Sequence, residues 1–258
     1  MLKTVLSAVV IFCTHLLEAI TGFGSSVLAL PFLNLTMDGL QLPVQMLCVL
    51  SWVMALYIVI RSWKDILWKE FLFILLWVGI GVPVGMWIFE RLPQYILCLI
   101  LGTFMVAVGI RGEISTVRSR SVPPVNAGND AAPVKRSWWM KLLLTAGGII
   151  QGAFGTGGPF IVIYSAQALP NKRVFRVTLS LLWLCTNSYR LVSWGINGTL
   201  WNAELGSTLL WAVPVVGAGI AVGDYLHNKV SEYHFKLGVY AVLVLSGIFM
   251  TATNAIKL

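Results

Sequence analysis

Charged residues are scarce in this sequence of 258 residues: 11% of them are Asp, Glu, Lys or Arg, whereas 58% are hydrophobic. Soluble domains carry about 25% charged residues. With so few charges, a water-soluble fold of this length would expose large apolar patches. The composition, with a mean hydropathy of +0.84, therefore excludes a soluble enzyme or a nucleic-acid-binding domain and indicates a polytopic membrane protein.

Motifs for metal binding, nucleotide binding and covalent catalysis are also lacking. The four cysteines stand singly in apolar segments without the spacing of metal ligands, and the sequence contains no P-loop. Ser25, Cys13 and His15 lack the spacing of a nucleophile with its base. We therefore expect no enzymatic activity, no metal, no cofactor and no use of ATP. The cysteines, expected in the core or facing lipid, are Cys13, Cys48, Cys98 and Cys185.

Lysine and arginine outnumber the acidic residues by 18 to 10, which gives a net charge of +8. In a soluble protein this excess would suggest nucleic acid, but here the cations stand between apolar segments, as in the cytoplasmic loops of membrane proteins. The N-terminus is apolar, contains one early cation, Lys3, and lacks a cleavage motif. We expect a retained helix there and no nucleic-acid partner.

Six apolar segments are long enough to cross a bilayer, which takes about 20 residues. Two longer apolar regions, 2–35 and 138–169, are interrupted by small and polar residues at 21–26 and 152–159. Residues 112–137 are polar, contain three prolines and predict a flexible linker. The six predicted spans are 43–60, 70–89, 94–110, 175–193, 204–223 and 236–253.

The two halves of the sequence resemble each other. A shift of 131 residues aligns the two interruptions and two tryptophan pairs, and a shift of 134 aligns later positions, so a three-residue insertion reconciles them. We predict a duplication, with a first repeat at 1–111, the linker at 112–137 and a second repeat at 138–258. The matched pairs include Phe23 and Phe154, Gly24 and Gly155, Trp52 and Trp183, Trp63 and Trp194, Trp77 and Trp211, and Gly85 and Gly219.

Positive charge is distributed in opposite order in the two halves. Successive first-half loops contain none, three and one Lys or Arg, whereas the matching second-half loops contain three, none and two. Because cytoplasmic loops retain positive charge, matching loops are expected on opposite sides of the membrane. Three spans per half give this inversion if each interrupted region is a re-entrant hairpin, with both termini outside and the linker in the cytoplasm. The loops compared are 36–42, 61–70, 90–93, 170–176, 194–204 and 224–236.

The interruptions are candidate binding elements, since inverted repeats with broken helices are common in secondary transporters. Small residues leave the backbone N–H groups of a helix N-terminus reachable, and two such termini could hold an anion at the midplane. The expected residues are Gly22, Phe23, Gly24, Ser25 and Ser26 in the first break, and Gly155, Thr156, Gly157, Gly158 and Pro159 in the second. Close helix packing is the alternative, which we expect instead for Gly79, Gly81, Gly85, Gly217, Gly219 and Gly223.

Polar residues inside the apolar segments need a reason, because inserting them into a membrane is costly. His15 and Glu18 stand one turn apart before the first break. Two interpretations are open: the two residues form a proton-responsive pair, or Glu18 accepts hydrogen bonds from backbone N–H groups and shapes the break. Gln151 could shape the second break, and Asn187 is a candidate donor to the substrate. Arg190 is either a fixed cation for an anion or an arginine that reaches the outer interface. Interfacial anchoring or packing is expected for Trp52, Trp63, Trp183 and Trp194.

The paired interruptions resemble the signatures of the TauE/SafE family of sulfite and organosulfonate exporters. The similar segments run from Gly22 to Pro31 and from Gly152 to Pro159, and the duplicated layout extends the resemblance to nearly the whole chain. The resemblance implies transport of small sulfur-containing anions, mostly outward, across the cytoplasmic membrane of bacteria. Ser25 and Ser26 stand where the family has more glycine, and their hydroxyl groups could donate to substrate oxygens.

These observations predict an all-α membrane protein of two inverted repeats, each with an interrupted helix and three transmembrane helices. The predicted function is secondary transport, as an exporter in the inner membrane, of sulfite or an organosulfonate bound between the two breaks. The partners are then the small anion, the lipid bilayer and, through His15 and Glu18, a proton. An anion channel with the same site, an intramembrane enzyme and a non-transporting assembly subunit are the alternatives.

Overall fold

The computed structural model describes residues 2–21, 23–37, 39–120, 137–169, 172–200, 203–226 and 232–255. Within these ranges the secondary structure is helical, with no strand. The chain divides into two compact units. The first consists of Met1–Arg91 and Arg136–His227, and the second of Leu92–Lys135 and Asn228–Leu258. Each unit therefore combines segments from both halves of the sequence.

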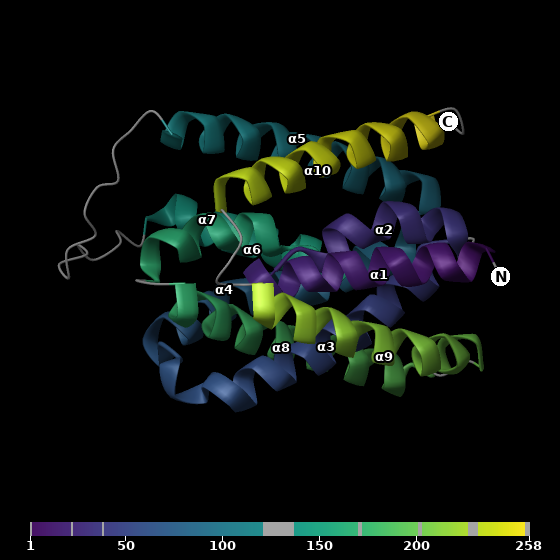
Figure 1. Cartoon of the computed structure of the whole chain (residues 1–258), viewed down its shortest axis with the longest axis horizontal. Helices are drawn as coiled ribbons and strands as arrows, with labels where there is room; N and C mark the ends of the chain where they lie inside the picture. The colour runs from purple at the N-terminus through teal and green to yellow at the C-terminus, as the bar shows by residue number, and fades with distance from the viewer. Residues whose placement is uncertain are drawn as a thin grey trace. The chain divides into compact units, whose positions relative to one another are not determined.

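The described helices follow the same order in the two halves (Figure 1). In each half the second helix is the shortest, with 12 residues in α2 and 11 in α7. The first half contains α1 (Leu2–Thr21), α2 (Ser25–Thr36), α3 (Gln41–Ser62), a 3-10 turn at Trp63–Asp65, α4 (Trp68–Arg91) and α5 (Gln94–Arg120). The second contains α6 (Trp138–Phe154), α7 (Gly158–Ala168), α8 (Lys172–Ile196), α9 (Ala203–Leu226) and α10 (Glu232–Ala255).

Five segments of the described helices are long and apolar enough to cross a membrane. The spans predicted at 175–193 and 236–253 are helical, as α8 and α10, but are not among these five. In α8 the reason is the polar run from Thr186 to Arg190, which includes side chains buried inside the first unit. The five are Leu2–Ile20, Gln41–Asp65, Trp68–Arg91, Gln94–Ser115 and Ala203–Gly223.

The predicted linker begins too early. Residues 112–120 continue α5, so the boundary placed at 112 is wrong, whereas 121–136 lie outside the described residues. In the second unit α5 lies along α10, and Gly112 packs against the ring of Tyr240. Contact with α10 therefore continues the helix into polar sequence.

Glycine brings helix backbones of the first unit close together. A Cβ atom at Gly85 of α4 would lie 2.8 Å from the backbone nitrogen of Ala153 in α6. A Cβ atom at Gly219 of α9 would lie 3.1 Å from the carbonyl oxygen of Phe12 in α1. The packing role is confirmed for Gly81, Gly85, Gly219 and Gly223 and is wrong for Gly79 and Gly217, where a Cβ atom would meet nothing within 4 Å.

In the first unit α3 and α8 lie side by side and run in opposite directions. Near the start of α3, the Gln45 side-chain amide donates to the carbonyl of Thr199, which follows α8, at 2.9 Å. About two turns later, Trp52 Nε1 donates to Ser188 Oγ at 2.8 Å. Rising residue numbers in α3 thus meet falling numbers in α8, and the helices are antiparallel.

The same relation holds between α5 and α10 in the second unit, which lie side by side in Figure 1. A Cβ atom at Gly102 would lie 2.9 Å from the carbonyl oxygen of Gly247, and one at Gly109 would lie 3.0 Å from that of Tyr240. Hence α5 and α10 are antiparallel as well.

The close approach of α4 and α6 makes a stability prediction with a control in the same helix. Gly85→Ala should lower the free energy of unfolding of the purified protein by about 1–3 kcal/mol, because the added methyl group forces the two backbones apart. Gly79→Ala adds the same methyl group where nothing lies within 4 Å, so it should be neutral or stabilising by up to about 1 kcal/mol. Unfolding curves in detergent would measure both, and equal shifts would contradict the packing described here.

Candidate functional site

The first break lies between α1 and α2. Gly24 precedes α2 with φ of 106°, in the left-handed region that a residue with a Cβ atom rarely adopts. Gly22 lies outside the described residues. Two side-chain contacts join the helices: Ser7 Oγ and Thr36 Oγ1 are 2.8 Å apart, and Ser25 Oγ donates to the Glu18 carboxylate. The start of α2 therefore lies beside the last turns of α1.

The second break lies between α6 and α7 and has the same backbone device. Gly155, which the sequence shift pairs with Gly24, ends α6 with φ of 72°. Gln151 then uses its side chain to hold the break, since its Oε1 accepts the N–H of Gly157 at 3.0 Å. This contact confirms that Gln151 shapes the break. Pro159 occupies the first turn of α7, where its missing N–H leaves no helix hydrogen bond unmade.

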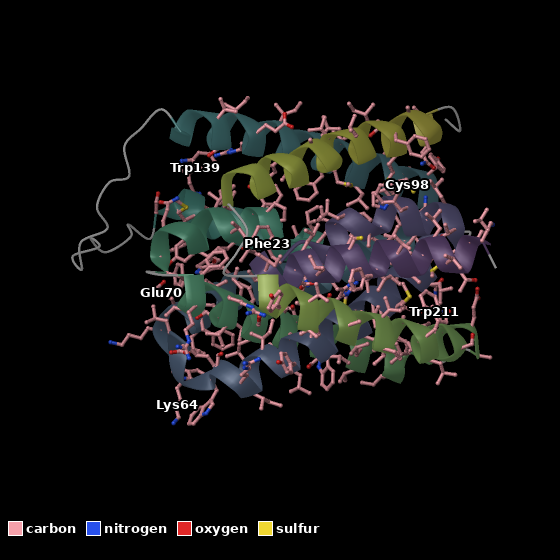
Figure 2. The ribbon with its side chains drawn as sticks, viewed as in Figure 1. Phe23, Lys64, Glu70, Cys98, Trp139 and Trp211 are labelled. Atoms are coloured by element: carbon pink, nitrogen blue, oxygen red, sulfur yellow. The ribbon has the colours of Figure 1, made fainter. Side chains whose placement is uncertain are left out.

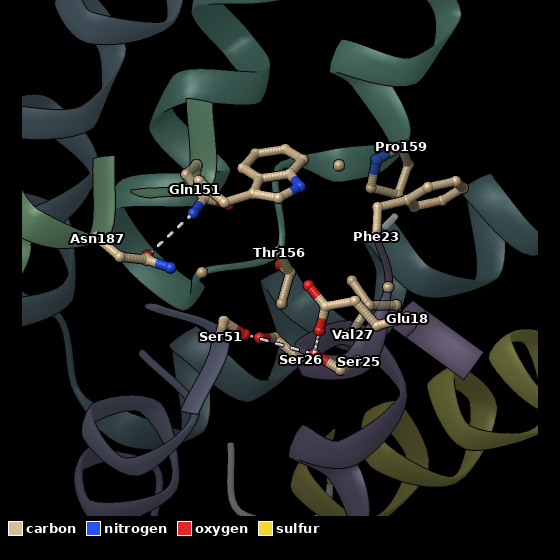
Figure 3. Close-up of a pocket in the computed structure, with 14 residues that line it drawn as sticks. Glu18, Phe23, Ser25, Ser26, Val27, Ser51, Gln151, Thr156, Pro159 and Asn187 are labelled. Carbon is tan, nitrogen blue, oxygen red and sulfur yellow. Dashed lines mark hydrogen bonds between the residues drawn. The ribbon is translucent and has the colours of Figure 1, made fainter. Parts of the chain in front are cut away.

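Both breaks line one cavity inside the first unit (Figure 3). The cavity has a volume of about 20 Å³, enough for about one water molecule. Of the residues expected at the site, those that line it are Glu18, Phe23, Gly24, Ser25, Ser26, Gln151, Gly155, Thr156, Gly158, Pro159 and Asn187. His15, Gly157 and Arg190 do not line it.

Two groups of hydrogen-bonding side chains face each other across the cavity (Figure 3). On one side Gln151 Nε2 donates to Asn187 Oδ1 at 3.3 Å. On the other, Ser25 donates to Glu18 and lies 3.5 Å from Ser51, measured between the hydroxyl oxygens. Thr156 lies between the two groups in this view, and its buried hydroxyl oxygen has no partner among the described residues.

Arg190 lies behind the second break, fully buried. Its Nη1 is 3.5 Å from Asn187 Oδ1, and its guanidinium carbon lies 4.7 Å from the centre of the Trp194 ring. A Cβ atom at Gly155 would lie 2.8 Å from the same Nη1, so the head group reaches the break itself. The interpretation of Arg190 as an arginine that reaches the interface is wrong, because no part of it is exposed.

His15 is also fully buried but lies outside the cavity wall. Its Nδ1 is 2.9 Å from the carbonyl oxygen of Ile11, one turn earlier in α1. Its Nε2 has no hydrogen-bond partner among the described residues. The structure thus separates His15 from Glu18, which does line the cavity.

Three residues that line the cavity were not expected there: Val27, Ser51 and Trp183. Trp183 is 6% exposed and belongs to the cavity wall, so it is not an interfacial anchor. Its partner in the repeat, Trp52, donates to Ser188, and Trp194 is buried under Arg190. Of the four tryptophans compared, Trp63 is the exposed one, at 58%. The sequence signal for Trp183 was its match with Trp52 under the same shift of 131 residues that aligns the two breaks.

A wider hollow of about 390 Å³ opens at the end of the first unit where α1 and α9 begin. Its lining includes Lys3, Glu204 and Trp211, of which Trp211 is labelled in Figure 2. None of the residues expected at the binding site lines it. The smaller cavity between the breaks is therefore the candidate site.

The part of the chain that the structure describes contains no group of three His, Cys, Asp or Glu residues placed to hold a metal ion. Within the described residues the four cysteines form no disulfide bond. Cys48 and Cys98 are buried, Cys185 is half-buried and Cys13 is exposed.

Comparison with known proteins extends over this whole arrangement. The family model described as sulfite exporter TauE/SafE matches residues 7–250, a range that contains both breaks and every residue lining the cavity. No curated protein and no solved structure matches the chain. Since the match covers most of the 258 residues, the chain belongs to the TauE/SafE sulfite exporter family of membrane transporters.

Proposed function

We propose that the protein is a secondary carrier that exports a small sulfur-containing anion, such as sulfite or an organosulfonate, from a bacterial cell across the inner membrane. The anion binds in the cavity between the breaks, next to Gly155 and Asn187, the lining residues that the Arg190 head group reaches. The observation that carries the proposal is the position of this guanidinium, buried at the second break without a carboxylate partner among the described residues.

The electrostatic argument starts from the cost of a buried charge. A guanidinium removed from water is strongly unfavourable unless an anion or several acceptors surround it. Arg190 has one weak acceptor, Asn187 Oδ1 at 3.5 Å, and its Nε and Nη2 have no hydrogen-bond partner in the described part of the chain. The planar donors of arginine suit the oxygens of a sulfite or sulfonate group. Such an anion would satisfy Arg190.

The helix ends add to this attraction. α2 begins at Ser25 and α7 at Gly158, and both residues line the cavity. The N-terminus of a helix carries roughly half a positive charge and several N–H groups that have no partner within the helix. The hydroxyl group of Thr156, unpartnered and buried between the breaks, is a further donor. The cavity therefore favours an oxyanion over a cation or an apolar molecule.

The size of the cavity favours a carrier over a channel. About 20 Å³ is room for one water molecule, whereas sulfite has four non-hydrogen atoms. The helices around the breaks must therefore separate before the anion enters. A carrier that alternates between two access states has such a rearrangement in every cycle.

An inverted repeat would supply the two states. α3 and α8 are equivalent helices of the two repeats, and they pack antiparallel in the first unit. α5 and α10 are equivalent as well and pack antiparallel in the second unit. A two-fold axis that exchanges antiparallel equivalents runs across the helices, and for helices that cross a bilayer such an axis lies in the membrane plane. This direction supports opposite orientations for the two repeats.

Contacts on both sides of each break support re-entrant hairpins. Residue numbers rise in α2 as they fall along α1, from the contact of Ser25 with Glu18 to that of Thr36 with Ser7. In the second repeat a Cβ atom at Gly147 of α6 would lie 2.9 Å from the Ile161 side chain of α7. Backbone that leaves helical geometry within a bilayer requires such cover by protein. Each short helix would then return to the side from which the preceding helix entered.

Removing the buried cation tests the binding site. Arg190→Gln should reduce sulfite flux into proteoliposomes by about tenfold to a hundredfold, as expected from losing charge-assisted hydrogen bonds. Sulfite should raise the melting temperature of the wild type but not of Arg190→Gln. The matched control is Arg173→Gln, because Arg173 is 73% exposed and pairs with Asp65 at 2.7 Å. Full flux in Arg190→Gln would refute the site, and flux without counterflow would indicate a channel.

Obstructing the second break should also stop transport. A Cβ atom at Gly157 would lie 2.7 Å from the Cβ of Gln151, so Gly157→Ala should displace the side chain that holds the break. We expect at least about a tenfold loss of flux, equivalent to 1.4 kcal/mol or more, in a protein that still inserts. Gly195→Ala, with nothing within 4 Å of the new Cβ atom, is the control. Equal flux in the two variants would argue against a functional break.

The re-entrant hairpin predicts on which side two exposed positions lie. In a chain whose four native cysteines are replaced by alanine, single cysteines at Ser137, before α6, and at Gly198, after α8, should label from opposite sides. The hairpin does not cross, so α8 provides the one crossing between them. A membrane-impermeant maleimide added to intact cells should reach position 198 and not 137. Labelling of both from one side would mean that the interrupted segment crosses the membrane.

A further inference from the structure

We propose that Glu18 binds a proton whenever the anion occupies the cavity, and that this proton crosses the membrane with the anion. This inference rests on the proposed carrier function and assigns the coupling ion and the residue that binds it. It also separates the roles of His15 and Glu18.

The carboxylate of Glu18 lies where the anion would bind. Glu18 is 7% exposed and lines the same cavity as Thr156 and Asn187, near the end of α1 (Figure 3). Its partner is the hydroxyl group of Ser25, which lies 3.5 Å from the Ser51 hydroxyl. Ser25 itself begins α2. A hydroxyl group serves both forms of the carboxyl, since it can donate to the carboxylate or accept from the carboxylic acid.

No described cation forms an ion pair with Glu18. On its own helix, His15 turns Nδ1 toward the carbonyl of Ile11 and does not line the cavity. α2 contains no ionisable residue. Arg190 is the cation that contacts the cavity wall: it donates to Asn187, which lines the side of the cavity opposite Glu18.

The other helices around the site add no carboxylate to the cavity wall. α3 contributes Ser51, and its ionisable Cys48 is buried one turn earlier. Glu204 of α9 and Lys3 of α1 line the wider hollow of about 390 Å³ and not this cavity. The side chain of Asp224, in the last turn of α9, is outside the described residues. The other ionisable groups of the elements packed in this unit do not line the cavity. They include Lys141, which lies over Trp77, and Tyr164, which donates to Glu70. The rest among the described residues are Cys13 of α1, Tyr57 and Arg61 of α3, Lys64 and Asp65 of the 3-10 turn, Lys69, Glu90 and Arg91 of α4, Arg173, Arg176, Cys185 and Tyr189 of α8, and Tyr225 of α9.

Like charges cannot share so small a space. An anion in the cavity and an ionised Glu18 would be neighbours in a site from which nearly all water is excluded. Protonation removes the repulsion and turns the carboxyl group into a donor for a substrate oxygen. Binding of the proton and binding of the anion therefore favour each other, and linkage requires the two effects to be equal.

The charge balance explains why the two ions would move together. With Glu18 ionised and no anion, the charges of Glu18 and Arg190 sum to zero. With Glu18 protonated and a monoanion bound, the sum is again zero. With the anion alone the sum is −1, and this state carries an uncompensated charge through the low-dielectric interior. The empty and the doubly loaded states can therefore change access, whereas the state with the anion alone cannot.

This coupling has a consequence for the driving force. One proton and one monoanion move without net charge, so the membrane potential does not drive them. Export runs down the gradient of the anion, and a proton gradient that is acidic outside opposes it. In vesicles the same gradient should accumulate the anion, up to about tenfold for each pH unit.

The experiment uses the full-length protein in proteoliposomes with radiolabelled methanesulfonate, a probe that stays a monoanion over the pH range used. Two quantities are measured, the exchange of labelled for unlabelled anion at equal pH and the accumulation driven by an acidic exterior. We expect Glu18→Gln, whose amide can still donate to a substrate oxygen, to keep a measurable exchange of labelled anion and to lose the accumulation driven by the pH gradient. The matched control is Glu70→Gln, a carboxyl outside the cavity that accepts from Tyr164, and it should keep both activities.

A second variant and a second measurement guard against a folding defect in Glu18→Gln. Glu18→Asp keeps a titratable carboxyl and should keep accumulation. In the wild type, the apparent affinity for methanesulfonate should fall by up to about tenfold per pH unit once Glu18 ionises. Accumulation that persists in Glu18→Gln, that is lost in His15→Asn instead, or that is absent in a wild type able to exchange would overturn the proposal. A folded wild type with neither exchange nor uptake of sulfite or methanesulfonate would refute the carrier function itself.

Discussion

A backbone that leaves helical geometry inside a bilayer must find hydrogen-bond partners within the protein, and this constraint organises the first unit. Gly24 and Gly155 turn the chain with positive φ angles at equivalent positions of the two halves. At the second break Gln151 receives the N–H of Gly157. The other end of its amide donates to Asn187, and therefore ties the break to the polar run of α8.

The same constraint explains why α8 is less apolar than its neighbours. Thr186, Asn187 and Arg190 would be unfavourable facing lipid, and all three are buried in the protein. They lie behind or beside the cavity, so the composition of this helix reflects the site. Trp52 of the antiparallel helix α3 completes the contact by donating to Ser188. A helix that would be a poor membrane span alone is thus accommodated by its partners.

Close packing leaves little free space around the breaks. Glycines place α4 against α6 and α9 against α1 at distances that a methyl group would disturb. The cavity of about 20 Å³ is what remains between two helix ends and a carboxyl, and a buried guanidinium lies close to it at the second break. Under the proposed coupling, the carboxyl on one side and the guanidinium near the other make binding of an anion and binding of a proton favour each other. If the anion binds here as we propose, the packing requires the surrounding helices to move during transport.

Local features of the sequence sufficed for much of this picture. Hydropathy and glycine content depend on neighbouring residues alone, and they predicted a helical membrane protein, both breaks and most residues that line the cavity. The paired motifs also identified the family, because each lies within a short segment. The expectations that failed depend on contacts between residues far apart in the sequence. α5 continues past 112, where Gly112 packs on Tyr240 of α10, and Gly79 and Gly217 face open space.

The tertiary structure decided which polar groups share the site. His15 and Glu18 are one turn apart and equally plausible in the sequence, but the rotation of α1 places only Glu18 in the cavity wall. The sequence was equally compatible with Arg190 at the membrane interface. The packing of α8 against the second break buries it instead. Ser51 of α3 and Trp183 of α8 also line the cavity, and no sequence motif marked either of them. The sequence by itself determined the membrane class, the breaks and the family, since these depend on local composition. Which side chains meet across the cavity depends on how distant helices pack, and only the folded chain contains that information.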